Sequence, residues 1–382
     1  MEAFELLEII NRGEDSRHQF KREYSNDQSV AEELVAFANT KGGLLIFGVD
    51  DNSTVTGLST QEILEINRRL SPVFSQHIHP AINPDLENIN VSGKVVMVLT
   101  IAEGISKPYM DKNGVIWVKS GADKRRATSR EEIQRMYQSA GLIHGDEIPA
   151  NGMNIADIDI EYFSRFLKKE YNESIEENRE GLPRILDNMN LSKDGTLNIA
   201  GALLFSKAPQ FRLPVFIVKA VSYPGTGIDE KTYLDSQDIT GKLSDVFQKS
   251  LVFIINNLRL VQNDKNINST GDLEIPRVTL EELLANALIH RDYFVSAPIR
   301  LFVFFDRIEI VSPGHLPNNL TIDNIKNGNS NIRNPILASF ASKLLPYRGL
   351  GNGIRRALEA YSAITFIEDR EGNQFKVLIK RP

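Results

Sequence analysis

The segment EELLANALIHRDY, residues 281–293, constrains the fold of this chain more than any other stretch. Its leucines and alanines are spaced to bury one face of a helix over 279–291, while Glu282 and Asn286 lie one turn apart on a common side. A carboxylate and an amide in this relation can hold an attacking water and a magnesium ion beside the phosphates of a nucleotide. The same spacing is frequent on solvated helix surfaces, so the pair needs support from other motifs.

The motifs after this helix provide that support. The sequence predicts two strands, over 298–304 and 308–311, followed by the turn SPGH at 312–315 and a long Asn-rich loop. A second turn precedes a predicted helix over 354–361, and its glycines alternate at Gly349, Gly351 and Gly353. Such a turn exposes backbone N–H groups to an anion, and the dipole of the following helix adds to the attraction. We therefore expect the glycine turn to share a pocket with Glu282 and Asn286.

This order, together with the wording of HRDY, IEIVSPGHLP and GLGNGI, resembles the GHKL superfamily of ATPases, and above all its divergent branch in bacterial proteins described as RecG-related DNA helicases or transcriptional regulators. The resemblance implies an α/β sandwich over 197–382 that binds ATP and Mg²⁺. It implies that Glu282 is the catalytic general base, that Asn286 is the magnesium ligand and that 315–347 is the nucleotide lid. The residues that it places against the nucleotide are Asn286, Ser312, Gly314, Gly349, Gly351 and Gly353.

His290 has two interpretations. It lies eight residues beyond Glu282 and can therefore share its helical face, where it would contact a bound nucleotide. It also stands at the predicted C-terminal end of the helix, where a protonated imidazole interacts favourably with the helix dipole. The sequence leaves both interpretations open.

Ser312 departs from the superfamily pattern. The turn after the hairpin normally carries an Asp, whose carboxylate accepts a hydrogen bond from the adenine amino group. The neutral hydroxyl of Ser312 makes a weaker hydrogen bond, so we expect weak nucleotide binding with little selectivity for adenine. The chain also contains no G-x-x-x-x-G-K-[ST] phosphate loop, so nothing independent supports a helicase motor.

Three N-terminal segments form a second set of motifs. They are GEDSRHQFKREY (13–24), AFANTKGGLLIFGVDD (36–51) and WVKSGADKRRATSREEI (117–133). They resemble the Schlafen-type AlbA-like domain, a nucleic-acid-binding module that commonly precedes the divergent GHKL domain. Some Schlafen relatives cleave RNA with a metal held by carboxylates, but Gln19 stands here where the second acid would be. Although Glu14, Asp50 and Asp51 remain, we do not expect nuclease activity.

The segment 119–130 is basic, with the single acid Asp123. Its cations are Lys119, Lys124, Arg125, Arg126 and Arg130. Such side chains hold nucleic-acid phosphates and make the affinity depend on salt, so we expect this segment to bind nucleic acid, DNA rather than RNA. The alternative is a solvated loop before the helix at 129–140, for which Ser129 and Glu132 form a capping-box pattern. Nothing in the segment predicts sequence specificity.

Composition limits what else the chain can be. With 44 Lys and Arg against 50 Asp and Glu, the net charge is −6, which excludes a histone-like basic coat but permits a local basic patch. The chain has no Cys, so a thiol nucleophile and thiolate metal sites are excluded. No apolar run reaches the ~18 residues of a membrane span, and the N-terminus does not read as a signal peptide. We expect a cytoplasmic protein without a membrane partner.

The overall expectation is an α+β chain in three parts. Residues 1–142 form the AlbA-like α/β domain and 197–382 the GHKL-type α/β sandwich, joined by a linker and helical segment over 143–196. The apolar run IAGALLF, 199–205, predicts a strand.

Three functions fit these parts. The first is a nucleotide-responsive, DNA-associated transcriptional regulator that binds ATP and Mg²⁺. The second is an Mg²⁺-dependent ATPase acting on nucleic acid, with weak activity, and the third is a scaffold in which both sites are degenerate. The sequence leaves homo-oligomer formation open.

Overall fold

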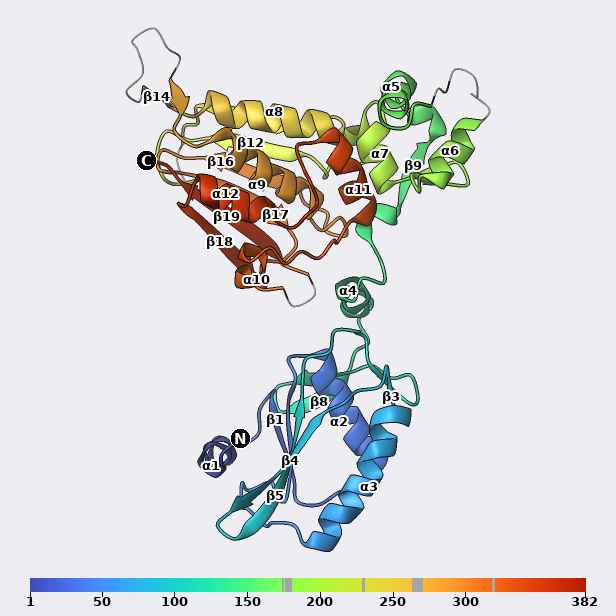
Figure 1. The fold of residues 1–382 in the computed structure, drawn as a ribbon, viewed down its shortest axis with the longest axis vertical. Coiled ribbons are helices and arrows are strands. Elements are labelled where there is room, and N and C mark those ends of the chain that lie inside the picture. The colour runs from blue at the N-terminus through green and yellow to red at the C-terminus, as the bar shows by residue number, and fades with distance from the viewer. Residues whose placement is uncertain (174, 176–180, 229–230, 263–270, 318–319) are drawn as a thin grey trace. The chain divides into compact units, whose positions relative to one another are not determined.

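The computed structural model of the protein describes residues 1–173, 175, 181–228, 231–262, 271–317 and 320–382. Within these residues the chain forms two compact units, Met1–Ile143 and His144–Pro382, each with its own hydrophobic core (Figure 1). A span long and apolar enough to cross a membrane is not found among the helices of the described residues.

The first unit is built on a four-stranded sheet in the order β1-β2-β5-β4. Its strands are β1 (His18–Lys21), β2 (Gly43–Phe47), β4 (Asp85–Val91) and β5 (Lys94–Ile101). Strands β1 and β2 run parallel, and the other neighbours run antiparallel. One face is covered by α1 (Ala3–Arg12) and the other by α2 (Asp27–Asn39) and α3 (Thr60–Gln76). Because β2 is covered on both faces, its sequence is a nearly unbroken apolar run.

The basic segment of the first unit forms a hairpin followed by a helix. These elements are β7 (Trp117–Ser120), β8 (Asp123–Arg126) and α4 (Arg130–Ser139), and the unit also holds the strand pair β3 (Ile78–His79) and β6 (Met110–Asp111). As predicted, Ser129 caps α4 by accepting a hydrogen bond from the Glu132 backbone N–H. The Glu132 side chain does not return to the cap, however, and binds Arg125 instead.

In the described residues of the second unit, a six-stranded sheet has the order β13-β12-β16-β17-β19-β18. Its strands are β12 (Val218–Ser222), β13 (Asp235–Ile239), β16 (Ile299–Val303), β17 (Arg307–Pro313), β18 (Ile364–Asp369) and β19 (Gln374–Lys380). Strands β12 and β16 run parallel and the remaining neighbours antiparallel. One face carries α8 (Leu243–Asn256), α9 (Arg277–Ile289) and α12 (Gly353–Ala360) (Figure 1).

Shorter elements connect the sheet and its helices. They are η4 (Pro209–Phe211), β14 (Leu260–Val261), β15 (Asp272–Leu273), α10 (Ile322–Lys326) and α11 (Pro335–Leu344). Helix α9 is apolar almost all round because it is packed between the sheet and other helices, and apart from its first two residues only Glu281 and Asn286 of the helix are not buried.

Residues 144–196 belong to the second unit, which corrects the expectation of a separate segment over 143–196. Their elements are η1 (Gly145–Glu147), β9 (Pro149–Asn154), η2 (Ile155–Asp157), α5 (Ile160–Tyr171), α6 (Leu182–Asn188), β10 (Ser192–Lys193) and β11 (Thr196–Asn198). Phe166 of α5 lies 5.7 Å, between ring centroids, from Phe340 of α11. The described residues of this segment therefore share one core with the sheet and its helices, and the polar, Pro- and Gly-containing stretch that suggested a linker forms η1 and β9.

The apolar run at 199–205 is a helix, α7 (Ile199–Phe205), and the predicted strand is wrong. Asn198 caps the helix by accepting a hydrogen bond from the Gly201 backbone N–H at 2.7 Å. Every residue of α7 is buried, and a short apolar run that is buried on all sides looks the same in sequence whether it is a helix or a strand.

The HRDY motif fixes the end of α9 against two neighbouring turns. The Asp292 backbone N–H donates to the Pro313 carbonyl at 2.8 Å. The Asn334 side-chain amide donates to the carbonyls of Ile289 and Arg291 at 2.7 and 2.8 Å. These bonds hold the turn after β17 and the start of α11 at the end of α9.

Gly314 is required at this junction. Its φ is +97°, and an added Cβ would lie 2.5 Å from the Asp292 Cβ. We expect Gly314→Ala to lower the free energy of unfolding by at least about 2 kcal/mol more than Gly195→Ala, because position 195 shares the positive φ (+81°) but has no atom nearer than 4.0 Å. Urea unfolding of the two variants measures the difference, and equal losses would contradict the steric argument.

Candidate functional site

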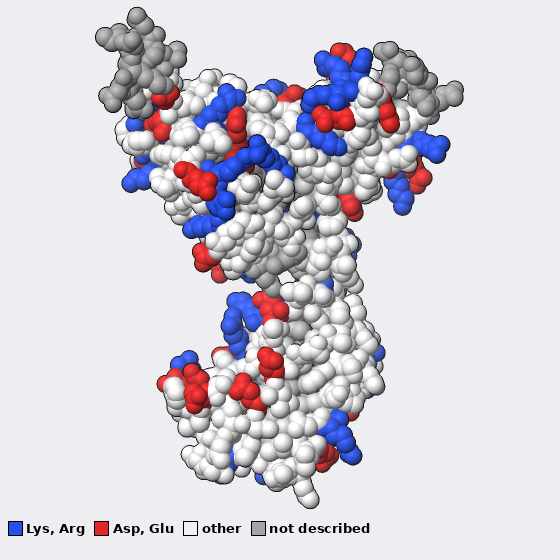
Figure 2. Space-filling model, viewed as in Figure 1, with Lys and Arg blue, Asp and Glu red and all other residues white. Residues whose placement is uncertain are grey.

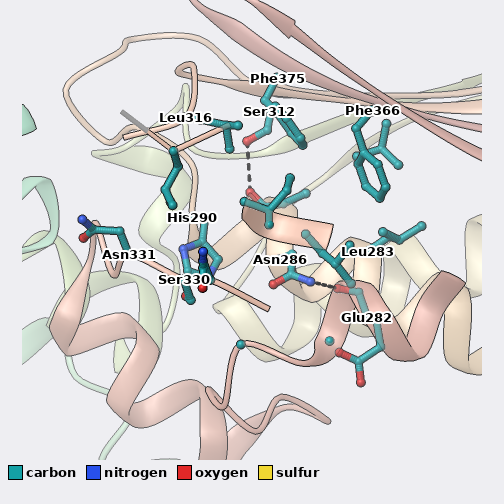
Figure 3. Close-up of a pocket in the computed structure, with 18 of the residues that line it drawn as sticks. Glu282, Leu283, Asn286, His290, Ser312, Leu316, Ser330, Asn331, Phe366 and Phe375 are labelled. Carbon is teal, nitrogen blue, oxygen red and sulfur yellow. Dashed lines mark hydrogen bonds between the residues drawn. The ribbon is translucent and has the colours of Figure 1, made fainter. Parts of the chain in front are cut away.

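The second unit contains a pocket between α9, the sheet and the segment 315–353 (Figure 3). One end is apolar and is lined by Leu283, Ala287, Ile310, Leu316, Phe366, Phe375 and Val377. The other end is polar and is formed by the start of α12 and the polar pair of α9. All eight residues expected at a nucleotide line this one pocket: Glu282, Asn286, His290, Ser312, Gly314, Gly349, Gly351 and Gly353.

The glycine turn lets α12 begin directly against α9. Gly349 and Gly351 have φ of +66° and +74°, a conformation that favours glycine. A Cβ on Gly353 would overlap Oε2 of Glu282 and lie 3.4 Å from Nδ2 of Asn286. Glycine at position 353 therefore brings the N-terminal end of a helix into contact with the carboxylate and the amide.

Asn286 presents its oxygen as a ligand. Its Nδ2 donates a hydrogen bond to the Glu282 carbonyl at 2.8 Å, which leaves Oδ1 available at the pocket (Figure 3). Mg²⁺ is commonly held by one or two protein oxygens together with substrate phosphates, and Asn286 fits that arrangement. A ready-made cluster of three His, Cys, Asp or Glu side chains is not found among the described residues, so a metal here would depend on a phosphate ligand as well.

Glu282 is buried and ion-paired, which the sequence did not indicate. Its side chain is 4% exposed and forms an ion pair with Arg356 of α12. Arg348, just before the glycine turn, also lines the pocket. The signal in the sequence was that both arginines flank the alternating glycines, where an anion was expected.

His290 forms a neutral part of the pocket wall. Its Nε2 lies 3.1 Å from the Tyr347 hydroxyl. Burial, together with the smaller effect of the nearby positive charge of Arg333, lowers the pKa of His290 to about 4. The imidazole is therefore neutral near pH 7 and does not act as a cation at the end of α9, which removes one of the two interpretations drawn from the sequence.

Ser312 lies at the apolar end of the pocket, and its hydroxyl group donates its hydrogen bond within the protein. Its Oγ donates a hydrogen bond to the Ala287 carbonyl at 3.1 Å (Figure 3). The lone pairs of Oγ remain, so toward the pocket Ser312 acts as a hydrogen-bond acceptor.

The expected lid approaches the glycine turn through its backbone. Asn329, Ser330 and Asn331 line the pocket, and a Cβ on Gly351 would overlap the Gly328 carbonyl. Residues 318–319 of this segment lie outside the described residues. The contact shows that the segment after α10 reaches the polar end of the pocket.

In the first unit, Lys119 is not free to bind phosphate as the sequence suggested. Its side chain is 1% exposed, and its Nζ lies 2.7 Å from Oε1 of Glu33. It also donates to Oε1 of Gln19 at 2.9 Å. The acid that neutralises Lys119 comes from α2, far away in the sequence, and so a count of charges within 119–130 could not show it.

Two further cations of the segment are also paired. Lys124 lies 3.1 Å from Glu32 and 3.5 Å from Glu33, and Arg125 makes two hydrogen bonds to Glu132 at 2.7 and 3.0 Å. The two remaining cations, Arg126 and Arg130, are exposed and have no ion pair within the described part of the chain. On the visible face of each unit, basic and acidic side chains are interspersed (Figure 2).

The acids expected in a metal-dependent nuclease serve the fold. Oε1 of Glu14 accepts hydrogen bonds from the Gln19 side chain at 2.5 Å and from the Phe20 backbone at 2.6 Å. Asp50 accepts from the backbone N–H of Asn52 and of Thr54 at 3.0 and 2.8 Å. In the described residues these acids form no metal-binding group.

Comparison with protein families assigns both units. Residues 14–128 match the family "Schlafen, AlbA_2", and residues 296–379 match the family "Putative ATP-dependent DNA helicase recG C-terminal". The second match begins after α9, so Glu282 and Asn286 precede it. A search of the curated proteins found no match.

Two solved structures resemble the chain. The DIP2311 protein from Corynebacterium diphtheriae is 21% identical, with a TM-score of 0.48, over 99% of this chain and 80% of that chain. The N-terminal domain of the "Putative ATP-dependent DNA Helicase RecG-related Protein" from Nitrosomonas europaea is 28% identical, with a TM-score of 0.27, over 34% of this chain and 91% of that chain. At these TM-scores the likenesses carry no functional argument.

The fold and the family matches define an α+β protein with an N-terminal Schlafen domain and a C-terminal ATPase-like domain. The chain joins a Schlafen AlbA_2 domain to a domain of the RecG-related helicase C-terminal family, which confirms the resemblance and the fold class expected from the sequence. Its domains are of kinds associated with nucleic acid and with nucleotide-dependent enzymes.

The neutral state of His290 makes a prediction about pH. Because its pKa in the folded protein, about 4, lies below the unfolded value of 6.5, its contribution to stability is complete above pH 6.5 and is lost as pH falls toward 4. The wild type should therefore lose unfolding free energy when the pH is lowered from 7 to 5. In His290→Gln we expect this loss to be about 2 kcal/mol smaller. Parallel urea titrations of wild type and variant measure this difference.

The comparison must be differential, because Asp146 titrates in the opposite sense. Burial raises the pKa of Asp146 to about 6, so its contribution is present below about pH 4 and is lost as pH rises through 6. Asp146 is unchanged in both proteins and cancels. An identical pH dependence in wild type and His290→Gln would show that His290 is not held neutral by the fold.

Proposed function

We propose that this protein is a nucleotide-responsive, DNA-associated regulator, with ATP bound in a GHKL-type pocket of the second unit. The observation that carries the proposal is the pocket itself. It joins an apolar end, at which Ser312 offers a hydrogen-bond acceptor, to a polar end built from a glycine turn, a helix N-terminus and a carboxylate–amide pair. These two ends have the chemistry of a base site and a phosphate site.

The base would lie at the apolar end. Its amino group could donate to Oγ of Ser312, which is oriented as an acceptor by its bond to the Ala287 carbonyl. A guanine presents a carbonyl at the corresponding position and would face acceptor against acceptor. The arrangement supports adenine over guanine, although a neutral acceptor contributes only about 1 kcal/mol.

The phosphates would lie at the polar end. The backbone N–H groups of the turn from Gly349 to Gly353 and the side chain of Arg348 supply donors and positive charge. Asn286 would hold Mg²⁺ through its side-chain oxygen, and the ion would supply the charge neutralisation that a triphosphate needs in a partly buried site.

The state of Glu282 favours binding over rapid hydrolysis. A general base must be able to accept a proton from the attacking water. The ion pair with Arg356 makes the Glu282 carboxylate a weaker proton acceptor. This observation supports a regulator in which nucleotide occupancy is the signal. It keeps an Mg²⁺-dependent ATPase as the second candidate, with Arg356 as the obstacle to turnover.

Only some of the five cations in the segment 119–130 of the first unit would contact nucleic acid. Arg126 and Arg130 are the members of the 119–130 set that remain exposed and outside ion pairs in the described residues. Arg126 also lies 5.3 Å from the ring centre of Trp117, which holds the guanidinium near the surface of the hairpin. The interface we propose is therefore a small phosphate contact with a modest salt dependence.

The nucleotide site can be tested through its metal dependence. We expect a non-hydrolysable ATP analogue to bind more tightly with Mg²⁺ than without it, and Asn286→Ala to abolish that gain while leaving the Mg²⁺-free affinity within about threefold. Isothermal titration calorimetry in Mg²⁺ and in EDTA measures both quantities.

Asn257→Ala is the matched control, because Nδ2 of Asn257, the C-cap of α8, makes the same kind of bond to the carbonyl one turn earlier, at 2.9 Å, outside the pocket. An Mg²⁺ effect that survives in Asn286→Ala would assign the metal to another group. Absence of any nucleotide binding by the wild type would leave the scaffold as the surviving function.

The nucleic-acid contact can be tested through salt. We expect Arg126→Ala/Arg130→Ala to reduce the slope of log affinity against log salt by about 2, because two phosphate contacts are lost. Fluorescence anisotropy with a labelled duplex at several salt concentrations gives the slope. Arg125→Ala is the control from the same hairpin and should change the slope little, since Glu132 already neutralises Arg125. A double variant with an unchanged slope would relocate the interface.

A further inference from the structure

The ion pair between Arg356 and Glu282 lies inside the proposed phosphate end of the pocket. Both residues line the pocket, Glu282 from the middle of α9 and Arg356 from the first turn of α12. The Glu282 side chain is 4% exposed, whereas the Arg356 side chain is 28% exposed. The carboxylate is therefore fixed in the wall, and the guanidinium is the partner that solvent and ligand can reach.

Arg356 has bonding capacity left over. Its Nε is buried and has no hydrogen-bond partner within the described residues. In a purely structural ion pair, the buried N–H groups of an arginine donate to the carboxylate or to backbone carbonyls. The spare donor beside an anion-binding turn points to a second acceptor.

We propose that Arg356 distinguishes a nucleoside triphosphate from a diphosphate. The terminal phosphate competes with Glu282 for the guanidinium, and its binding moves Arg356 from the carboxylate to the phosphate. This inference rests on the proposed nucleotide site. It assigns to Arg356 the property that a regulator needs, a response to the terminal phosphate.

The surroundings of Glu282 allow Arg356 to bind either the carboxylate or a phosphate. A buried carboxylate is costly without a partner, so Arg356 stays on Glu282 when no phosphate is present. A phosphate carries more charge than a carboxylate and can accept two parallel N–H bonds from the guanidinium, so it can win the competition. The N-terminal end of α12, in contact with Glu282 at Gly353, still favours the negative charge after Arg356 has left.

The test compares the affinities of a non-hydrolysable ATP analogue and of ADP, both in EDTA, for four variants. Glu282→Gln removes the competitor, and we expect it to tighten the analogue about tenfold and ADP by less than twofold. Arg356→Ala should weaken the analogue about tenfold and ADP little. In the double variant Glu282→Gln/Arg356→Ala, removal of the competitor should bring no gain over Arg356→Ala alone.

Arg355→Ala is the matched control, because Arg355 is adjacent on the same helix but exposed and paired with Glu359 at 3.2 Å. It should bind both nucleotides as the wild type does. The double variant also guards against misfolding, since it leaves no unpaired buried carboxylate behind.

The outcomes separate this inference from the proposed function. A wild type that binds neither nucleotide contradicts the nucleotide site itself. A wild type that binds both, with Glu282→Gln tightening the analogue equally in the presence and absence of Arg356, overturns the competition and leaves the nucleotide site standing. An equal loss of analogue and ADP affinity in Arg356→Ala also overturns it, because Arg356 would then bind phosphates without reading the terminal one.

Discussion

The contact between the start of α12 and the middle of α9 is the constraint on which the second unit depends. Gly353 has no side chain, so the helix N-terminus, the carboxylate of Glu282 and the amide of Asn286 meet without an intervening atom. The rest of α9 is largely apolar and buried, and its packing against the core fixes the position of Glu282 and Asn286 relative to the sheet. A side chain at 353 would displace the carboxylate of Glu282 and crowd the amide of Asn286, which would disrupt the polar end of the pocket.

Each unit contains a cation that is neutralised by an acid distant in sequence. Lys119 is paired with Glu33 in the first unit, and Arg356 with Glu282 in the second. The pair in the first unit is almost entirely buried and holds the hairpin to α2, while the pair in the second unit keeps an accessible guanidinium. Burial therefore distinguishes a cation that holds the fold together from one whose guanidinium is accessible at the pocket.

The residues that line the pocket could be predicted from the sequence, whereas the ion pairs of the charged residues could not. The order of helix, hairpin and glycine turn was enough to bring Glu282, Ser312 and Gly353 to one pocket, because each motif has a local backbone reason for its shape. The pairing of Lys119 depends on a residue 86 positions earlier, and local spacing contains no information about such contacts. The same limit applies to the run at 199–205, where burial on every side removed the periodicity that separates helix from strand.

The hydrogen bond from the Leu337 backbone N–H to Asp146, at 2.9 Å, joins residues 191 positions apart and caps α11 from outside. The contact between the rings of Phe166 and Phe340 spans a similar stretch of chain. Contacts of such long sequence separation form slowly, because loop closure must precede any gain from them. During synthesis the first unit can fold as soon as it has left the ribosome, whereas residues 144–196 must wait for α11 before their core is complete. The second unit is therefore exposed to chaperones and proteases for longer than the first.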